Sequence, residues 1–161
     1  MTDVNHIKRI LRVPDHSFFL FGPRGIGKST WLKEVFAGGI YVDLLDSSLF
    51  LKLAGDPHAL EAIVGNRPQG SWVVVDEIQK VPILLDEVHR LMESRRWRFV
   101  LCGSSARKLR RGGVNLLGGR ALTLNMEPFS AAELGDRFDL AFALRWGMLP
   151  LVQFERTKTA D

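Results

Sequence analysis

Apolar segments alternate with segments of helical spacing along this chain. Five apolar runs predict strands at residues 17–21, 40–45, 72–76, 99–104 and 121–124. Apolar residues that recur three or four positions apart predict helices at 28–37, 47–64, 82–94, 105–111 and 138–146, and a short leading helix at 4–13. Strands that alternate with helices and are apolar throughout favour a parallel sheet with helices on both faces, a three-layer α/β fold.

Capping and breaking residues refine several boundaries. Gly38 and Gly39 are expected to end the helix that begins at residue 28. The helical segment 47–64 is expected to be broken at residues 55–57, with Asp56 capping a second helix that starts at Pro57. Ser130 and Glu133 have the spacing of a capping box, which predicts a further helix start.

The residues Gly22–Ser29 match the phosphate-binding pattern G-x-x-x-x-G-K-[ST], between a predicted strand and a predicted helix. Consecutive backbone N–H groups in such a loop hold a phosphate, and the following helix adds its positive end. Lys28 is predicted to reach the β- and γ-phosphates, and Ser29 to coordinate Mg²⁺. The alternative is a glycine-rich turn with an exposed lysine. The predicted nucleotide-binding residues are Gly22, Pro23, Arg24, Gly25, Ile26, Gly27, Lys28, Ser29 and Thr30.

Two acidic residues, Asp76 and Glu77, follow the apolar strand 72–76 and resemble a Walker B element. Ligands of a parallel sheet lie beyond the carboxyl ends of its strands, so both side chains are expected near Lys28 and Ser29. Asp76 is predicted to hold Mg²⁺, and Glu77 to polarise the water that attacks the γ-phosphate. The alternative is a strand that ends in a polar turn.

Ser104 and Arg120 are further candidate catalytic residues, next to Glu77 and Lys28. Ser104, with its neighbour Ser105, follows the strand 99–104 and is interpreted either as a γ-phosphate sensor or as a helix N-cap. Arg120 precedes the last strand, where an arginine stabilises transition-state charge in its own chain or a neighbouring subunit, or is simply on the surface. Arg24 is interpreted as solvated rather than catalytic.

Composition is that of a water-soluble globular domain. The 161 residues fit one domain, with 46% hydrophobic and 25% charged residues. No apolar run approaches the roughly 20 residues that span a bilayer, and the N-terminal residues lack the pattern of a secretory signal. Cys102 is the single cysteine and is expected to be a buried, inert thiol. A cytoplasmic location is predicted, with no membrane contact.

Basic residues concentrate in the segment 95–120. Between Glu93 and Glu127 there is no acidic residue, whereas the net charge of the whole chain is +4. The basic residues there are Arg95, Arg96, Arg98, Arg107, Lys108, Arg110, Arg111 and Arg120. Such a stretch can contact nucleic acid, or it can be a solvated surface with some charge drawn to the nucleotide.

The motifs together resemble one family. The segments 19–30 and 75–82, followed by Cys102–Ser105, Gly118–Arg120 and Glu127–Phe129, are similar to prokaryotic AAA-type ATPases that carry a C-terminal domain of unknown function. The resemblance covers roughly residues 15–152 and implies a five-stranded sheet of order 5-1-4-3-2, with ATP and Mg²⁺ as ligands. It also implies an ATPase domain at residues 1–152. Residues 153–161 are then a polar tail or the start of a C-terminal domain that is missing.

Three functions follow from these observations. The first is Mg²⁺-dependent ATP hydrolysis coupled to a partner or to a C-terminal domain, with water oriented by Glu77. The second is a nucleotide-operated switch with negligible turnover. The third is a P-loop small-molecule kinase, in which the segment 107–120 acts as a lid. Exposed apolar residues near Pro150 are expected to favour self-association.

Overall fold

A computed structural model describes residues 7–104, 106–110 and 117–156 of the chain. The predictions for residues 4–6, Ser105, Arg111, most of the glycine-rich segment and the tail from residue 157 lie outside these ranges. The side chains of Lys108 and Arg110 also lie outside the described part.

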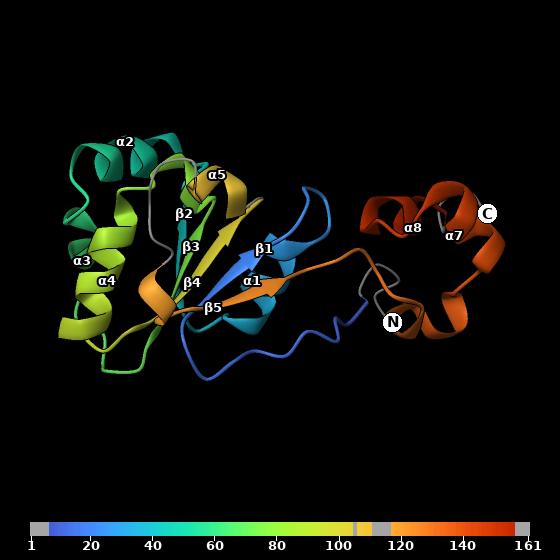
Figure 1. Ribbon diagram of the computed structural model, residues 1–161, viewed down its shortest axis with the longest axis horizontal. Coiled ribbons are helices and arrows are strands. Elements are labelled where there is room, and N and C mark those ends of the chain that lie inside the picture. The colour runs from blue at the N-terminus through green and yellow to red at the C-terminus, as the bar shows by residue number, and fades with distance from the viewer. Residues whose placement is uncertain (1–6, 105, 111–116, 157–161) are drawn as a thin grey trace.

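Five parallel strands form one sheet in the described part of the chain (Figure 1). They are β1 (Phe18–Phe21), β2 (Ile40–Asp43), β3 (Trp72–Asp76), β4 (Arg98–Gly103) and β5 (Leu122–Asn125). The strand order is β2-β3-β4-β1-β5, which is the predicted order 5-1-4-3-2 counted from the other edge. The three-layer α/β fold and its strand order are therefore confirmed.

The described part of the chain has eight α-helices: α1 (Lys28–Val35), α2 (Ser47–Gly55), α3 (Ala59–Val64), α4 (Leu84–Ser94), α5 (Ala106–Arg110), α6 (Ala131–Leu134), α7 (Leu140–Trp146) and α8 (Pro150–Arg156). Three short 3₁₀ turns accompany them: η1 (Ile78–Lys80), η2 (Leu117–Gly119) and η3 (Gly135–Arg137).

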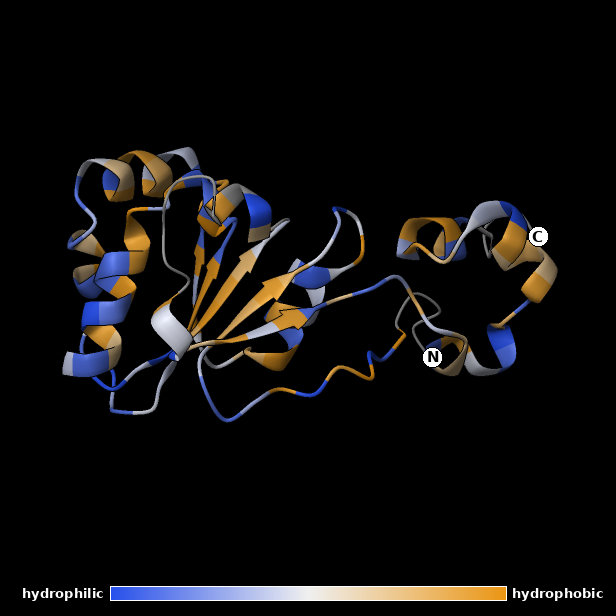
Figure 2. Ribbon diagram, viewed as in Figure 1, coloured by the Kyte–Doolittle hydropathy of each residue, from blue (hydrophilic) through white to orange (hydrophobic). Residues whose placement is uncertain are grey.

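Alternate residues of the central strands pack into separate hydrophobic cores on the two faces of the sheet. In β1, Phe19 belongs to the core that includes residues of α2, α3, α4 and α5, whereas Phe18 and Leu20 belong to the core that includes residues of α1. Figure 2 shows that the strands are mainly apolar, whereas the helices are of mixed character. A strand buried on both faces reads as an unbroken apolar run, which is why the sequence predicted these strands well.

The leading helix predicted at residues 4–13 is wrong over its described part. Residues 7–14 form no helix or strand. The ring of Pro14 disfavours helical backbone at Val13. The backbone N–H of Ile10 donates to the Glu133 carboxylate, 2.9 Å away, instead of to a helical carbonyl. This segment is therefore extended along the C-terminal part of the chain.

The interruption near Asp56 is confirmed, but the second helix starts later than predicted. The first regular helical residue of α3 is Ala59, not Pro57. The Asp56 carboxylate accepts the backbone N–H of His58 at 3.0 Å, so it closes a turn before the helix.

The C-terminal helices lie beyond the end of the sheet, next to the N-terminal segment (Figure 1). The capping box of Ser130 and Glu133 is present at the start of α6. The sequence did not predict α8, which begins at Pro150 and continues across residue 152. Proline suits the first turn of a helix because that turn needs no N–H donor.

Candidate active site

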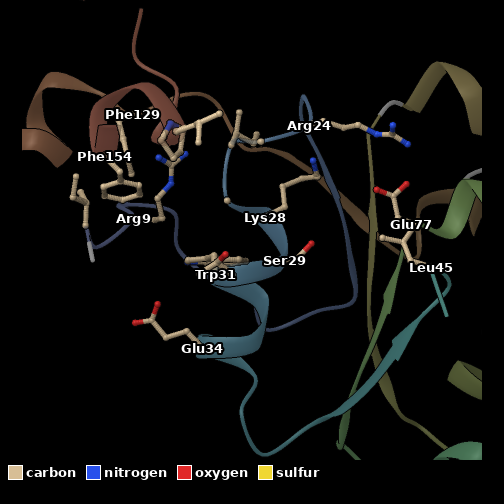
Figure 3. A pocket seen from close by; sticks show the side chains of 17 residues that line it. Arg9, Arg24, Lys28, Ser29, Trp31, Glu34, Leu45, Glu77, Phe129 and Phe154 are labelled. Atoms are coloured by element: carbon tan, nitrogen blue, oxygen red, sulfur yellow. The ribbon is translucent and has the colours of Figure 1, made fainter. Parts of the chain in front are cut away.

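A cavity of about 710 Å³ lies between the sheet and the C-terminal helices (Figure 3). Three parts of the chain line it: the loop after β1 with the start of α1, the N-terminal segment, and the end of the chain from Phe129 to α8. Leu45 and Glu77 complete the wall on the side of the sheet. The volume falls within the range of about 300–1,000 Å³ that is usual for small-molecule sites.

The loop between β1 and α1 has the backbone that its glycines permit. Gly25 and Gly27 have φ angles of 80° and 87°, which favour glycine over other residues. Gly22 has φ 153°, and a Cβ there would collide with the carbonyl oxygen of Met126. Glycine is therefore required at Gly22 for two independent reasons.

Lys28 is 7% exposed, and its ammonium group is held by the loop itself. Its Nζ donates to the carbonyl oxygens of Gly22 and Pro23 at 2.7 and 2.8 Å. These neutral carbonyls leave the positive charge of Lys28 uncompensated among its hydrogen-bond partners in the described residues. The lysine can therefore attract an anion in the cavity that it lines.

Asp76 is the centre of a hydrogen-bond cluster at the end of β3. Its Oδ2 accepts from the hydroxyls of Ser29 at 2.7 Å and Tyr41 at 2.5 Å, and its Oδ1 accepts the backbone N–H of Glu77 at 2.9 Å. Burial alone would raise the pKa of Asp76, but the donors Tyr41, Ser29 and Cys102 outweigh it and the pKa is lowered. The cluster brings together Ser29 and Asp76, as the sequence predicted.

Tyr41 belongs to this cluster although the sequence did not single it out. Its ring is half-buried on β2, and both burial and the neighbouring Asp76 carboxylate raise the pKa of its hydroxyl. The phenol is thus a neutral donor to a charged acceptor. The available signal was a hydroxyl between two apolar residues, Ile40 and Val42, in the strand next to that of Asp76.

Glu77 lines the cavity from an unusual backbone conformation. Its φ of 58° and ψ of 38° are left-handed, which is rare for a residue with a side chain. Its carboxylate accepts a hydrogen bond from the side-chain amide of Gln79. Figure 3 shows Glu77 on the side of the site toward which Arg24 extends. Strained residues of this kind are concentrated at functional sites.

Ser104 and Arg120 lie at opposite ends of the parallel strands, Ser104 at the carboxyl ends and Arg120 at the amino ends. Ser104 directly follows β4, beside the ends of β1 and β3, so it is at the same edge as the loop and Glu77. Arg120 precedes β5, whose first residue Leu122 pairs with Phe18 at the start of β1. The structure therefore does not bring Arg120 to the cavity of its own chain, and Arg120 is not among the residues that line it.

Arg120 instead pairs with Glu93 at 3.1 Å. Other basic residues of the segment 95–120 also have partners. Arg95 pairs with Glu61, and Arg98 donates to the carbonyl of Gly70 at 2.9 Å while lying over the Trp72 ring. The described cations of this segment are therefore partly neutralised.

Arg9 lines the cavity and was missed by sequence reasoning. Its guanidinium lies 4.7 Å from the centre of the Phe129 ring and 3.4 Å from the Glu133 carboxylate. Burial lowers the pKa of Arg9, and Glu133 partly offsets the effect. Phe129 and Phe154 stack edge to face beside it. No local sequence signal identifies such a residue, because its partners lie more than 100 positions away in the chain.

The sheet order and the motifs at its carboxyl edge agree with the comparisons to known proteins. Residues 15–135 match a family described as AAA domain, and the chain belongs to this family. It is 28% identical over 145 residues to a Holliday junction branch migration complex subunit RuvB from Oleidesulfovibrio alaskensis, covering 87% of this chain and 40% of the relative. It is 31% identical over 128 residues to the RuvB subunit of Nitratidesulfovibrio vulgaris, covering 78% of this chain and 35% of the relative.

The chain thus spans well under half the length of these relatives. The family match and the similarity to RuvB subunits point to an AAA-type ATPase domain. Among the described residues, no helix is both long and apolar enough to cross a membrane. Nor do three or more histidine, cysteine, aspartate or glutamate side chains of the described ranges gather as a metal site.

Proposed function

We propose that this domain binds ATP with Mg²⁺ in the cavity and hydrolyses it. The observation that carries the proposal is the 2.7 Å hydrogen bond between Ser29 and Asp76, with Lys28 and Glu77 lining the cavity beside it. Two motifs that are 47 residues apart in the chain thus meet at one edge of the sheet. A phosphate-binding loop next to two carboxylates is suited to phosphoryl transfer to water.

The loop residues Gly22–Thr30 would hold the phosphates through their backbone N–H groups. Lys28 would exchange its two carbonyl partners for phosphate oxygens, because a charged acceptor binds an ammonium group more strongly than a neutral one. Ser29 and Asp76 offer the oxygen donors that Mg²⁺ prefers, and would hold the ion together with the nucleotide. The bound ion would neutralise negative charge on the phosphates.

Glu77 would accept the proton of the attacking water, as a carboxylate in reach of the terminal phosphate can. Ser104 would contact the terminal phosphate or this water from the end of β4. Arg120 keeps one proposed catalytic role, in the site of a neighbouring subunit. The Glu93 pairing of Arg120 at the surface is weak enough to exchange for a partner across an interface.

Steady-state phosphate release by the wild type and Glu77→Gln tests the hydrolytic function, with ATP binding measured in the same samples. We expect both proteins to bind ATP and only the wild type to release phosphate at a measurable rate. Tight binding without release by the wild type would instead support a nucleotide-operated switch. Transfer of phosphate to an added small-molecule acceptor would support a kinase.

The output of the nucleotide cycle is also a proposal. A partner or a further domain would respond to the nucleotide through the C-terminal helices, which contribute Pro150, Leu151 and Phe154 to the cavity. Self-association is supported by apolar side chains exposed on these helices, with Leu144 81% and Leu151 64% exposed. The similar RuvB subunits are named for Holliday junctions, so nucleic acid remains a proposed partner of the basic segment 95–120. The cytoplasmic location remains a prediction.

A further inference from the structure

Gln79 is the polar residue of the Asp76–Gln79 segment that has no role in the proposed chemistry. It lies in η1, between Ile78, which is fully buried, and Lys80, whose Nζ donates to the carbonyl of Leu44 at 2.7 Å. The turn is thus fixed on both sides of Gln79. A side chain on a turn fixed in this way is well placed to hold a neighbouring group.

The hydrogen bonds define the orientation of the Gln79 amide. Its Nε2 donates to the carboxylate of Glu77, so its Oε1 faces the opposite way. That oxygen is buried and accepts no hydrogen bond from the described residues. It points to the end of β4, where a Cβ on Gly103 would lie only 2.5 Å from it. Gly103 therefore leaves the space that the amide occupies.

An unpaired buried oxygen is energetically unfavourable, and so is the left-handed backbone of Glu77. Both features occur where the Gln79 amide meets the Glu77 carboxylate. Unfavourable local geometry that the surrounding structure maintains is typical of functional sites. The carboxylate that it holds lines the cavity beside Lys28 and Ser29.

We propose that Gln79 is a positioning residue for ATP hydrolysis, whose amide nitrogen holds the Glu77 carboxylate at the cavity wall to accept a proton from the attacking water. Gly103 serves the same purpose by leaving room for the amide. This inference rests on the proposed function, because it requires Glu77 to be the proton acceptor.

Gln79→Ala and Gly103→Ala test the inference by two routes to the same contact. The first removes the amide, and the second adds a methyl group that displaces it. Misplacing a reacting group by about 1 Å costs up to about 100-fold in rate, so each variant is expected to lower kcat roughly 10- to 100-fold. Neither touches the phosphate-binding loop, so the Kd for ATP should change less than about twofold.

The double variant separates positioning from general damage. Without the amide, the methyl group at residue 103 displaces nothing that holds Glu77, so Gln79→Ala with Gly103→Ala should match Gln79→Ala alone. Gly38→Ala is the matched control, because a Cβ there meets no atom within 4 Å. Thermal unfolding of every variant verifies that it is folded.

Unchanged or increased kcat in folded Gln79→Ala would overturn the inference, as would losses that add in the double variant. An increase would mean that the amide restrains Glu77 from reacting. Glu77→Gln in the same assay identifies which idea has failed. If it abolishes hydrolysis while Gln79→Ala does not affect it, the positioning role fails and the proposed function stands. If Glu77→Gln remains active, the proposed function fails.

Discussion

Replacement of Tyr41 by phenylalanine removes one donor from the Asp76 cluster and keeps the ring. The lost hydrogen bond is 2.5 Å long and ends on a carboxylate that is 4% exposed, so solvent screens it little. Hydrogen bonds to charged groups contribute about 1.5–3 kcal/mol. Asp76 keeps the donors Ser29 and the backbone N–H of Glu77. We therefore expect a loss near the low end, about 1.5 kcal/mol at pH 7.

The stability lost in Tyr41→Phe should become smaller as the pH falls. The folded protein holds the pKa of Asp76 below its ordinary value, so this carboxylate stabilises the fold above the unfolded pKa of about 4. That contribution disappears as the pH falls through the folded pKa. Without the Tyr41 hydroxyl, the pKa of Asp76 in the folded protein is higher. The difference in the free energy of unfolding between wild type and variant is therefore full at pH 7 and narrows below about pH 4.

Thermal or urea unfolding of both proteins from neutral to acidic pH measures this gap. For a chain of this size, 1.5 kcal/mol corresponds to a fall in Tm of about 3–6 °C at pH 7. An equal fall at pH 7 and in acid would refute the reasoning, because it would trace the loss to packing of the ring. No fall at pH 7 would also refute it.

Three further changes have defined expectations. Lys28→Met removes the ammonium group that would contact phosphate, an interaction that contributes about 1.5–3 kcal/mol. Titration calorimetry should show ATP binding weakened at least about 10-fold; an unchanged affinity would contradict the proposed contact of Lys28 with phosphate. Gly22→Ala forces a methyl group against Met126 and should lower the free energy of unfolding by more than about 2 kcal/mol, whereas a normal urea midpoint would contradict the close approach. Arg120→Ala breaks an exposed pair with Glu93 and should cost at most about 1 kcal/mol of stability. The affinity for ATP should not change; weaker ATP binding by the monomeric variant would contradict the position of Arg120 away from the cavity of its own chain.

The sheet was predictable because its three central strands, β1, β3 and β4, are buried on both faces. The glycine-rich loop and the acidic pair Asp76 and Glu77 also lie at strand ends, where ligands of a parallel sheet bind. The predicted strand order also implied where Arg120 lies, at the start of β5 and away from the loop that follows β1. The neighbouring glycines had instead suggested that Arg120 is close to the nucleotide. A residue that precedes a strand parallel to β1 lies at the edge opposite to the loop that follows β1. The strand order thus places Arg120 away from the loop of its own chain before any side chain is placed.

Residues that act across the chain could not be predicted from local patterns. Tyr41 meets Asp76 through the register of β2 and β3, and the two residues are 35 positions apart. Arg9 reaches the cavity because the N-terminal segment is extended along α6. The spacing of apolar residues in this segment had indicated a helix instead. Periodicity indicates which face a helix would bury. It does not indicate whether a backbone N–H donates to a distant carboxylate instead of to a helical carbonyl, as that of Ile10 does.

The sharpest test of ATP hydrolysis at this site is a single-turnover reaction with Mg²⁺ present and the protein in excess over ATP and well above the Kd. All nucleotide is bound under these conditions, so product release does not limit the result. We expect the wild type to convert bound ATP to ADP and phosphate, whereas Glu77→Gln should retain the ATP at least about 100-fold longer. Intact ATP on the wild type, or equal conversion by Glu77→Gln, would contradict this expectation.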